Sequence, residues 1–161
     1  MILVTVGSSK FNFDRLLKII DKLCEKNIIN GKDVIAQIGY TDYVPKNYKY
    51  FISVPSDEFK KYIDKSDYII SHAGVGTIIK AVQKGKKVIV FPRRKKYNEH
   101  VDDHQMQIKK TLEDNGYVLS ANDFNELVNN IKMIKSFKPK KYKSNNKKIN
   151  KIIIDYIEGI D

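Results

Sequence analysis

The sequence has few of the residues that stabilise secreted proteins or let a chain cross a membrane. Cys24 is the only cysteine, so no disulfide can form within the chain. No apolar run approaches the roughly 20 residues that a helix needs to span a bilayer. Residues 1–6 carry no basic leader and are read as a first strand instead of a signal peptide. These absences favour a cytoplasmic protein in which Cys24 is a buried core thiol.

Several functional motifs are also missing. The first turn, Val6–Lys10, lacks the spaced glycines of a dinucleotide-binding dehydrogenase, and no acidic residue ends a strand at the expected distance. No nucleic-acid-binding motif accompanies the basic residues. His100 and His104 would share one face of a helix, but no third ligand with suitable spacing for zinc follows. We therefore expect no bound metal and no cofactor.

Charge is plentiful and unevenly distributed. The 161 residues include 30 lysines and arginines against 19 acidic residues, a net charge of +11. Residues 132–161 account for +6 of this, and residues 132–151 hold nine lysines and no acidic residue. Such a segment suits an acidic partner, either nucleic acid or an anionic membrane surface, and is equally typical of a solvated tail. A non-enzymatic nucleotide- or nucleic-acid-binding α/β domain is therefore the alternative to an enzyme.

Apolar periodicity predicts strands alternating with helices. Strands are predicted at 2–6, 34–38, 50–54, 67–70, 88–91 and 117–119, and helices at 12–25, from 56, at 77–84, at 103–114 and from 124. Ser56 is the predicted N-cap of the second helix, and Asp123 with Glu126 resembles a capping box before the last. This alternation predicts parallel βαβ units, and hence an α/β fold with a doubly wound, Rossmann-like parallel sheet.

Composition divides the chain into three parts. Residues 1–135 form the predicted α/β domain, residues 136–146 a basic linker, and residues 147–161 a carboxyl-terminal amphipathic helix. The apolar stripe of that helix consists of Ile149, Ile152, Ile153, Tyr156, Ile157 and Ile160.

The stretch Ser71-His-Ala-Gly-Val-Gly-Thr77 lies between a predicted strand and a predicted helix. Backbone N–H groups at such a turn have no partner and lie at the positive end of the helix dipole, so they can bind an anion such as phosphate. Gly74 and Gly76 would let a ligand approach the backbone, and Thr77 can cap the helix or donate to a phosphate oxygen. On its own the stretch is equally compatible with a turn that binds nothing.

Two further polar segments follow predicted strands, Gly7-Ser8 after the first and Arg93–Gln105 after the fifth. Ligands of parallel α/β sheets bind at the carboxyl ends of the strands. The three segments together therefore predict one site.

These segments resemble the carboxyl-terminal, donor-binding half of family 28 glycosyltransferases. The resemblance covers roughly residues 1–131 and is carried by Val4–Gly7 with Phe13-Asp14, Ser71–Gly76, Gly85-Lys86, Val90–Arg93, Asn98–His100 and Asp103–Gln105. Within the family the chain is similar to the small subunit of split two-chain enzymes, which include a eukaryotic UDP-GlcNAc transferase of the dolichol pathway. The Pro-Arg-Arg and Glu-His elements favour the bacterial branch, which makes capsular or exopolysaccharide.

The resemblance implies half of a GT-B fold, a UDP-sugar donor and hexosyltransferase activity. The loop Gly74–Thr77 would contact the diphosphate, the segment Asp103–Gln105 would lie near the donor sugar, and Arg93 and His100 would neutralise the leaving UDP. His104 is the candidate catalytic residue. The implied substrate-binding residues are Gly7, Ser8, His72, Ala73, Gly74, Val75, Gly76, Thr77, Arg93, His100, Asp103, His104 and Gln105. Lys80 replaces an acidic residue that binds ribose in many family members.

The resemblance also implies a partner. The acceptor-binding half of a two-domain glycosyltransferase is absent from this sequence, and a lipid-linked saccharide acceptor requires access to a membrane. We therefore expect a membrane-anchored, acceptor-binding subunit that supplies the general base, and activity only in its presence. Through that subunit the chain would lie at the inner, cytoplasmic face of the membrane, with no nucleic acid bound. The final amphipathic helix either docks on the partner or packs on its own domain.

Overall fold

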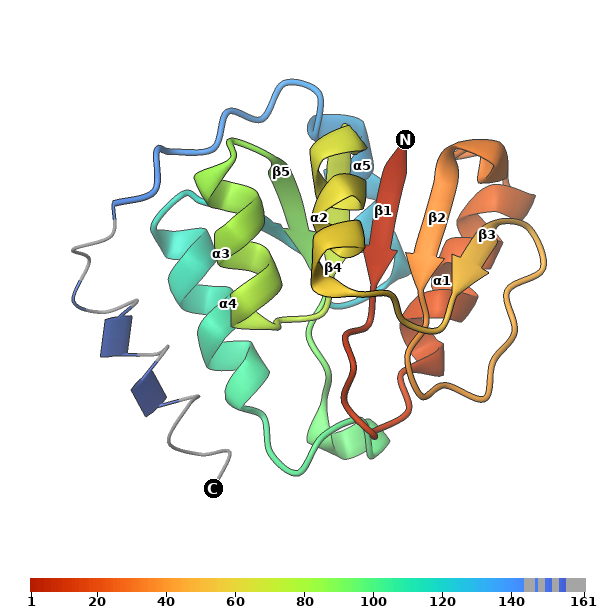
Figure 1. Ribbon diagram of the computed structural model, residues 1–161, viewed down its shortest axis with the longest axis horizontal. Helices are drawn as coiled ribbons and strands as arrows, with labels where there is room; N and C mark the ends of the chain where they lie inside the picture. The colour runs from red at the N-terminus through yellow and green to blue at the C-terminus, as the bar shows by residue number, and fades with distance from the viewer. Residues whose placement is uncertain (144–146, 148–149, 152–153, 156–161) are drawn as a thin grey trace.

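The computed structural model describes residues 1–143, 147, 150, 151, 154 and 155, and within them six parallel strands form one sheet (Figure 1). The strands are β1 (Ile2–Thr5), β2 (Val34–Gln37), β3 (Lys49–Phe51), β4 (Tyr68–Ser71), β5 (Lys87–Val90) and β6 (Leu119–Ser120). Their order is β3-β2-β1-β4-β5-β6, and every pair is parallel. The order reverses direction between β1 and β4, as in Rossmann-like folds. The predicted doubly wound α/β sheet is confirmed.

Helices cover both faces of the sheet (Figure 1). α1 (Asp14–Glu25) and α5 (Phe124–Met133) pack on one face, whereas α2 (Ser56–Lys65), α3 (Val75–Gln83) and α4 (His104–Asp114) pack on the other. Short 3-10 helices occupy Gly31–Asp33 and Lys95–Tyr97. Because each crossover returns the chain to the amino end of the next strand, the loops that follow the strands all gather at one edge.

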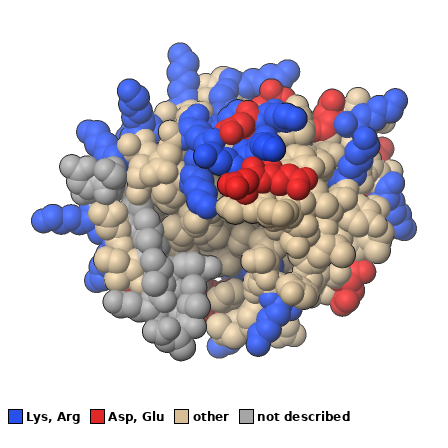
Figure 2. All heavy atoms as spheres, in the orientation of Figure 1, with Lys and Arg blue, Asp and Glu red and all other residues tan. Residues whose placement is uncertain are grey.

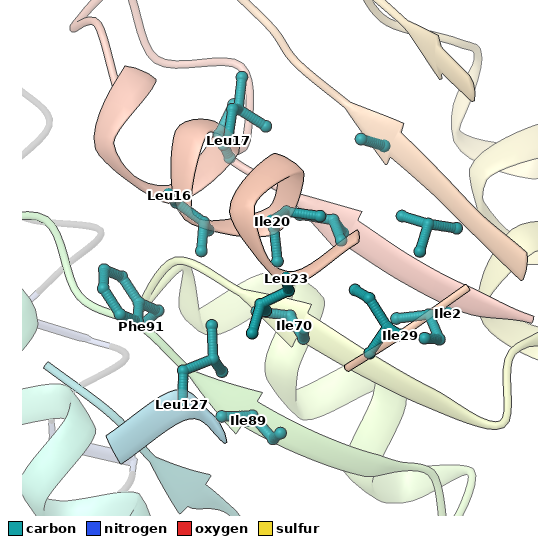
Figure 3. Close-up of a cluster of buried hydrophobic side chains, with 14 of the residues drawn as sticks. Ile2, Leu16, Leu17, Ile20, Leu23, Ile29, Ile70, Ile89, Phe91 and Leu127 are labelled. Carbon is teal, nitrogen blue, oxygen red and sulfur yellow. The ribbon is translucent and has the colours of Figure 1, made fainter. Parts of the chain in front are cut away.

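Two apolar clusters hold these layers together. Alternate residues of a strand point to opposite faces, so Val4 joins the cluster under α1 and α5 while Leu3 joins the cluster under α3 and α4. Figure 3 shows the first cluster, in which Leu16 and Ile20 of α1 lie over Ile70 of β4. All five side chains are fully buried. Each contributes about 1.5–3 kcal/mol through burial of apolar surface, which explains why the central strands are continuous apolar runs.

Two strands differ from the predicted ranges by more than one residue at an end, and the other four agree to within one residue. β3 begins at Lys49 and ends at Phe51, whereas the prediction was 50–54. β6 covers only Leu119–Ser120, because Tyr117 and Val118 pack in the cluster under α4 before the strand begins. Both are edge strands, where pairing on one side alone leaves the ends less constrained.

The helix caps are partly as predicted. Asp123 caps α5, since its side chain accepts a hydrogen bond from the Glu126 backbone N–H at 2.9 Å. The Glu126 carboxylate, however, accepts from the Asn122 N–H and not from that of Asp123, so the capping box is displaced by one residue. α2 is preceded by Pro55, and Ser56 is its first residue, so the prediction of Ser56 as N-cap is wrong.

After α5 the chain runs back along the domain. Phe137 packs on the cluster under α5, and the Lys140 N–H donates to the Gly116 carbonyl at 2.9 Å. The Tyr142 ring lies 5.5 Å from that of Tyr117. The residues of the predicted apolar stripe, Ile149 to Ile160, lie outside the described part of the chain. Among the described residues, no helix has the length and apolar character needed to cross a membrane.

Arg93, which follows β5, is completely buried. Its Nη2 donates to the Val6 carbonyl at 2.7 Å, and Nη1 donates to the Phe11 carbonyl at 2.7 Å and to the Glu99 carbonyl at 3.2 Å. The guanidinium lies 4.8 Å from the centre of the Phe13 ring. The expectation that Arg93 neutralises a leaving group is therefore wrong, because the loops it joins enclose its charge.

Glu99 balances this buried charge. Its carboxylate is nearly inaccessible and accepts hydrogen bonds from Arg15 Nε at 2.7 Å and from the Arg94 backbone N–H at 2.9 Å. Burial lowers the pKa of Arg93 to about 10, and the Glu99 charge opposes that shift, so the guanidinium stays charged near neutral pH. The Pro-Arg-Arg and Glu-His elements of the sequence thus form a structural network.

We predict that Arg93→Met lowers the free energy of unfolding by about 3 kcal/mol or more, since the carbonyl groups of Val6, Phe11 and Glu99 lose their donor and the Glu99 carboxylate loses a nearby positive charge. Arg94→Met is the matched control. The Arg94 guanidinium is partly exposed and lies 3.6 Å from Asp103, so its loss should cost less than about 1 kcal/mol. Urea denaturation measures both variants, with Arg93→Lys as an intermediate case should Arg93→Met not fold. Equal losses in the two Met variants would contradict a special role for Arg93.

Candidate functional site

A pocket of about 680 Å³ lies at the carboxyl ends of β1 and β4. This is the point where the strand order reverses, and open α/β sheets bind their ligands there. Its walls come from the turn after β1, the turn into α3 and the segment from His100 to Ile108. A hollow of about 820 Å³ lies at the amino ends of the strands, beside Met1, Tyr68 and Lys87. No turn between a strand and a following helix opens into that second hollow.

Most of the residues predicted for the site line the pocket. Those that do are Gly7, Ser8, His72, Gly74, Gly76, Thr77, His100, His104 and Gln105. They come from stretches far apart in the sequence, and the sheet brings them together because β1, β4 and β5 are neighbours. The prediction that the three polar segments share one site is thus supported by the geometry.

The amino terminus of α3 opens into this pocket. Its N-cap is Gly74, which has no side chain to cap the first turn, and the next residues, Val75–Thr77, expose N–H groups without intrahelical acceptors. Gly76 is exposed, and no heavy atom lies within 4 Å of the place a Cβ would take. Thr77 is the third residue of the helix, so the prediction that it caps the helix is wrong. Free N–H groups and the helix dipole make this turn receptive to an anion.

His72 is wedged between two glycines at the back of the pocket. A Cβ at Gly7 would lie 2.5 Å from the imidazole, and a Cβ at Gly74 would lie 2.3 Å from it. Nδ1 lies 3.4 Å from the Thr5 carbonyl. Burial, and next the charge of Arg93, lower the pKa of His72 to about 3, so this imidazole is neutral at physiological pH.

A second group of polar side chains faces α3 across the pocket. His100 Nδ1 lies 3.1 Å from an Asp102 carboxylate oxygen, and the same oxygen accepts the backbone N–H of His104 at 2.9 Å. His104 Nε2 is buried and has no hydrogen-bond partner among the described residues. The Gln105 side chain accepts from the Arg93 backbone N–H at 2.9 Å, which ties the start of α4 to the end of β5.

Four predicted site residues do not reach the pocket. The side chains of Ala73 and Val75 are buried in the cluster under α3, so these residues can offer only backbone groups. Arg93 is enclosed, as described above. Asp103 accepts the Lys95 N–H at 3.0 Å and lies 3.6 Å from Arg94 Nε, so its carboxylate is committed away from the pocket. The expected contact between Asp103 and a donor sugar is not present in this arrangement.

The structure removes the geometric basis for a metal site at His100 and His104, which was their predicted place on one helix face. α4 begins at His104, so His100 lies in the preceding loop and the two imidazoles do not share a helix face. Within the described part of the chain, no group of three or more His, Cys, Asp or Glu residues is arranged to hold a metal ion.

Sequence reasoning did not single out several lining residues. These are Ser9, Val101, Asp102, Ile108 and Asp155. A signal for Asp102 was present, because an aspartate two residues before the start of a helix often accepts a backbone N–H two positions on. Asp155 had no such signal, since its place beside the pocket depends on the path of the chain after α5.

Comparisons with known proteins agree on one family. Residues 1–158 match the glycosyltransferase family 28 C-terminal domain. The chain is 30% identical over 125 residues to a human UDP-N-acetylglucosamine transferase subunit ALG13, and 29% identical over 110 residues to the protein of that name from Cryptococcus neoformans. It also resembles an NMR solution structure of ALG13 with a TM-score of 0.62 at 23% identity, over 98% of this chain and 96% of that one. The last likeness concerns the fold alone.

The relatives are longer than the region they share with this chain. The human alignment covers 73% of this chain and 10% of the human protein, and the fungal alignment covers 66% of this chain and 53% of the fungal protein. The similarity is therefore that of a domain.

We predict that the close packing around His72 makes Gly74→Ala destabilising. The added methyl would meet the imidazole, and overpacking of this kind costs about 1–3 kcal/mol. In a His72→Ala background the same change should cost much less, giving a coupling energy above about 1 kcal/mol in a double-mutant cycle. Urea denaturation provides the four free energies. Gly76→Ala is the matched control and should be neutral or stabilising, because its Cβ enters open space.

We also predict that neutral His72 makes stability depend on pH. An unfolded histidine has a pKa of about 6.5, whereas that of folded His72 is lowered to about 3. Between these values the unfolded chain binds a proton that the folded chain does not. The contribution of His72 to the free energy of unfolding is therefore fully present above pH ~6.5 and is lost as the pH falls toward the pKa of the folded state.

The wild type should accordingly lose about 2 kcal/mol more than His72→Gln between pH 7 and pH 5. Urea titrations of both proteins at the two pH values test this. Equal losses of stability in the wild type and in His72→Gln would show that His72 takes up its proton in the folded chain as readily as in the unfolded chain.

Proposed function

This chain belongs to the family of glycosyltransferase family 28 C-terminal domains, and on that premise we propose that it is the donor-binding subunit of a heteromeric glycosyltransferase that uses a UDP-sugar. The observation that carries the proposal is the uncapped amino terminus of α3, which opens into a pocket at the strand reversal point. The names of the human and fungal relatives, both UDP-N-acetylglucosamine transferase subunits, support the same donor class.

Each part of the pocket has a role in this proposal. The N–H groups of Val75–Thr77 bind the diphosphate, and Gly76 leaves room for its oxygens beside the backbone. When the bond between the sugar and the β-phosphate oxygen breaks, negative charge grows on the departing UDP. The helix dipole and the imidazoles of His100 and His104 face this charge and stabilise it. The acceptor hydroxyl loses its proton to a base that we assign to the partner subunit.

The finer parts of the proposal rest on the sequence resemblance. They are a hexosyl donor, a lipid-linked saccharide acceptor, a membrane-anchored partner and a location at the inner face of the membrane. A role in capsular or exopolysaccharide synthesis was suggested by the Pro-Arg-Arg and Glu-His elements, but Arg93 and Glu99 act structurally here. The role in capsular or exopolysaccharide synthesis therefore stays a prediction, because Arg93 and Glu99 do not line the pocket. Family membership makes the alternative, a non-enzymatic nucleotide- or nucleic-acid-binding domain, the less favoured one.

Gly76 provides the sharpest test of the donor site. We predict that Gly76→Asp lowers UDP affinity at least about tenfold, because its carboxylate would stand among the N–H groups that bind phosphate. The same substitution should not lower the melting temperature, since a negative charge in the first turn stabilises a helix. Calorimetric titration with UDP and a thermal melt measure the two effects.

Gly76→Asn is the matched control, because it adds a side chain of nearly the same shape without the charge. We expect a loss of affinity of no more than about threefold for it. Comparable losses in the Asp and Asn variants would point to steric obstruction instead of an anion site. Absence of UDP binding by the wild type, both alone and with its partner subunit, would refute the proposed function.

A further inference from the structure

Asp102 is the common anchor of two imidazole-bearing residues in the pocket. One of its carboxylate oxygens lies 3.1 Å from His100 Nδ1 and 2.9 Å from the backbone nitrogen of His104. The side chain therefore fixes the direction of one imidazole and the first turn of the helix that carries the other. The His104 N–H, and next the neighbouring imidazoles, hold the pKa of Asp102 below its usual value, so the carboxylate is ionised.

An ionised carboxylate determines which nitrogen of His100 carries the proton. A carboxylate oxygen can only accept a hydrogen bond, so the 3.1 Å contact requires a proton on Nδ1. The Asp102 backbone N–H lies farther from Nδ1, at 3.4 Å, and would favour the opposite tautomer. The shorter contact to a charged acceptor is the stronger of the two.

The imidazole of His100 is also held from its other side. Its ring centre lies 5.6 Å from that of Phe11, which belongs to the loop after β1. Arg93 holds that loop in place, because its Nη1 donates a hydrogen bond of 2.7 Å to the Phe11 carbonyl. With Nδ1 committed to Asp102, Nε2 is the nitrogen left for a ligand in the pocket that His100 lines.

We propose that Asp102 is a positioning residue for the donor diphosphate, acting through His100. Asp102 holds Nδ1–H, so Nε2 of His100 faces the pocket. When the diphosphate binds, Nε2 takes up a proton from solvent, keeps it, and donates a hydrogen bond to a diphosphate oxygen. The carboxylate stabilises the imidazolium that results, as a carboxylate does for a histidine in other enzymes. This inference rests on the proposed function, because it assumes an anionic ligand at the amino terminus of α3.

The surrounding charges are consistent with this role. Among the described residues that line the pocket, the titratable groups other than His100 and Asp102 are His72, which is neutral, His104 and the Asp155 carboxylate. The charge of Arg93 is already engaged by carbonyl groups and balanced by Glu99. An imidazolium at His100 is therefore the side-chain cation that Asp102 can orient toward an anion.

Asp103 provides a matched control in the same loop. It is adjacent to Asp102 and carries the same charge, but its carboxylate accepts the Lys95 N–H and pairs with Arg94, away from the pocket. Asp102→Asn and Asp103→Asn thus remove one negative charge each from neighbouring positions. Only the first removes the charge from the group that accepts His100 Nδ1–H, and the amide NH2 that it introduces can instead donate to Nδ1, which favours the opposite tautomer.

The test combines imidazole NMR with titration of UDP. The chain has three histidines, so a ¹⁵N spectrum of the ring nitrogens contains few signals, and His100→Gln identifies those of His100. At pH 7.5 we expect His100 to be protonated on Nδ1 in the wild type and in Asp103→Asn, and to lose this preference in Asp102→Asn. Saturation with UDP should add a proton at Nε2 in the wild type and in Asp103→Asn, but not in Asp102→Asn.

UDP affinity should fall about tenfold in Asp102→Asn and less than about twofold in Asp103→Asn, since a charge-assisted hydrogen bond to the ligand is weakened only in the first. The ionisation of UDP itself is common to all variants and cancels in the comparison. Protonation of His100 on Nε2 in the free wild type, or equal losses of affinity in the two variants, would overturn the inference. A wild type with the expected tautomer that does not bind UDP, alone or with the partner, would instead contradict the proposed function.

Discussion

The pocket depends on one buried cation. Arg93 is completely inaccessible, yet its guanidinium donates to carbonyl groups at the end of β1, in the loop that follows it and in the loop after β5. A buried charge is tolerated only where hydrogen bonds replace its hydration, so the loops must close around it in one arrangement. Gln105 extends the arrangement, because it accepts the Arg93 backbone N–H and so fixes the start of α4. The loop after β1 and the loop after β5, which come from distant parts of the chain, therefore have a single relative placement before any ligand arrives.

This arrangement also sets the electrostatics of the pocket. Arg93 contributes to keeping His72 neutral, and the dipole of α3 adds partial positive charge at the adjoining wall, where Gly74 precedes the helix. In Figure 2, most lysine and arginine side chains on the visible face project from its upper part, away from the carboxyl ends of the strands. The proposed anion site would consequently rely on backbone groups and oriented imidazoles, since no lysine or arginine is among the described residues that line the pocket. Such groups are held in place by the fold, so little reorganisation would accompany binding.

The periodicity of the sequence predicted most of the fold. Central strands and amphipathic helices follow directly from apolar runs and from residues at helical spacing, which is why β1, β4 and α1 lie where expected. Edge strands were placed less well, because their pairing leaves a weaker pattern. The wrong predictions about site residues have a different cause. A sequence does not reveal whether Arg93 points inward, or which of two adjacent aspartates faces a pocket, since both depend on contacts between loops that only the folded sheet brings together.

The two glycines of the Gly74-x-Gly76 motif illustrate the same limit within three residues. A side chain at Gly74 would collide with the His72 imidazole, so the lack of a Cβ there serves the packing of the protein itself. A Cβ at Gly76 would have no atom of another part of the described chain within 4 Å, and this position is in a helix that any residue can join. Packing therefore explains the first glycine and leaves the second unexplained. Open space beside unpaired N–H groups is what a ligand needs in order to reach a backbone, so the proposed donor site gives Gly76 the reason that packing does not.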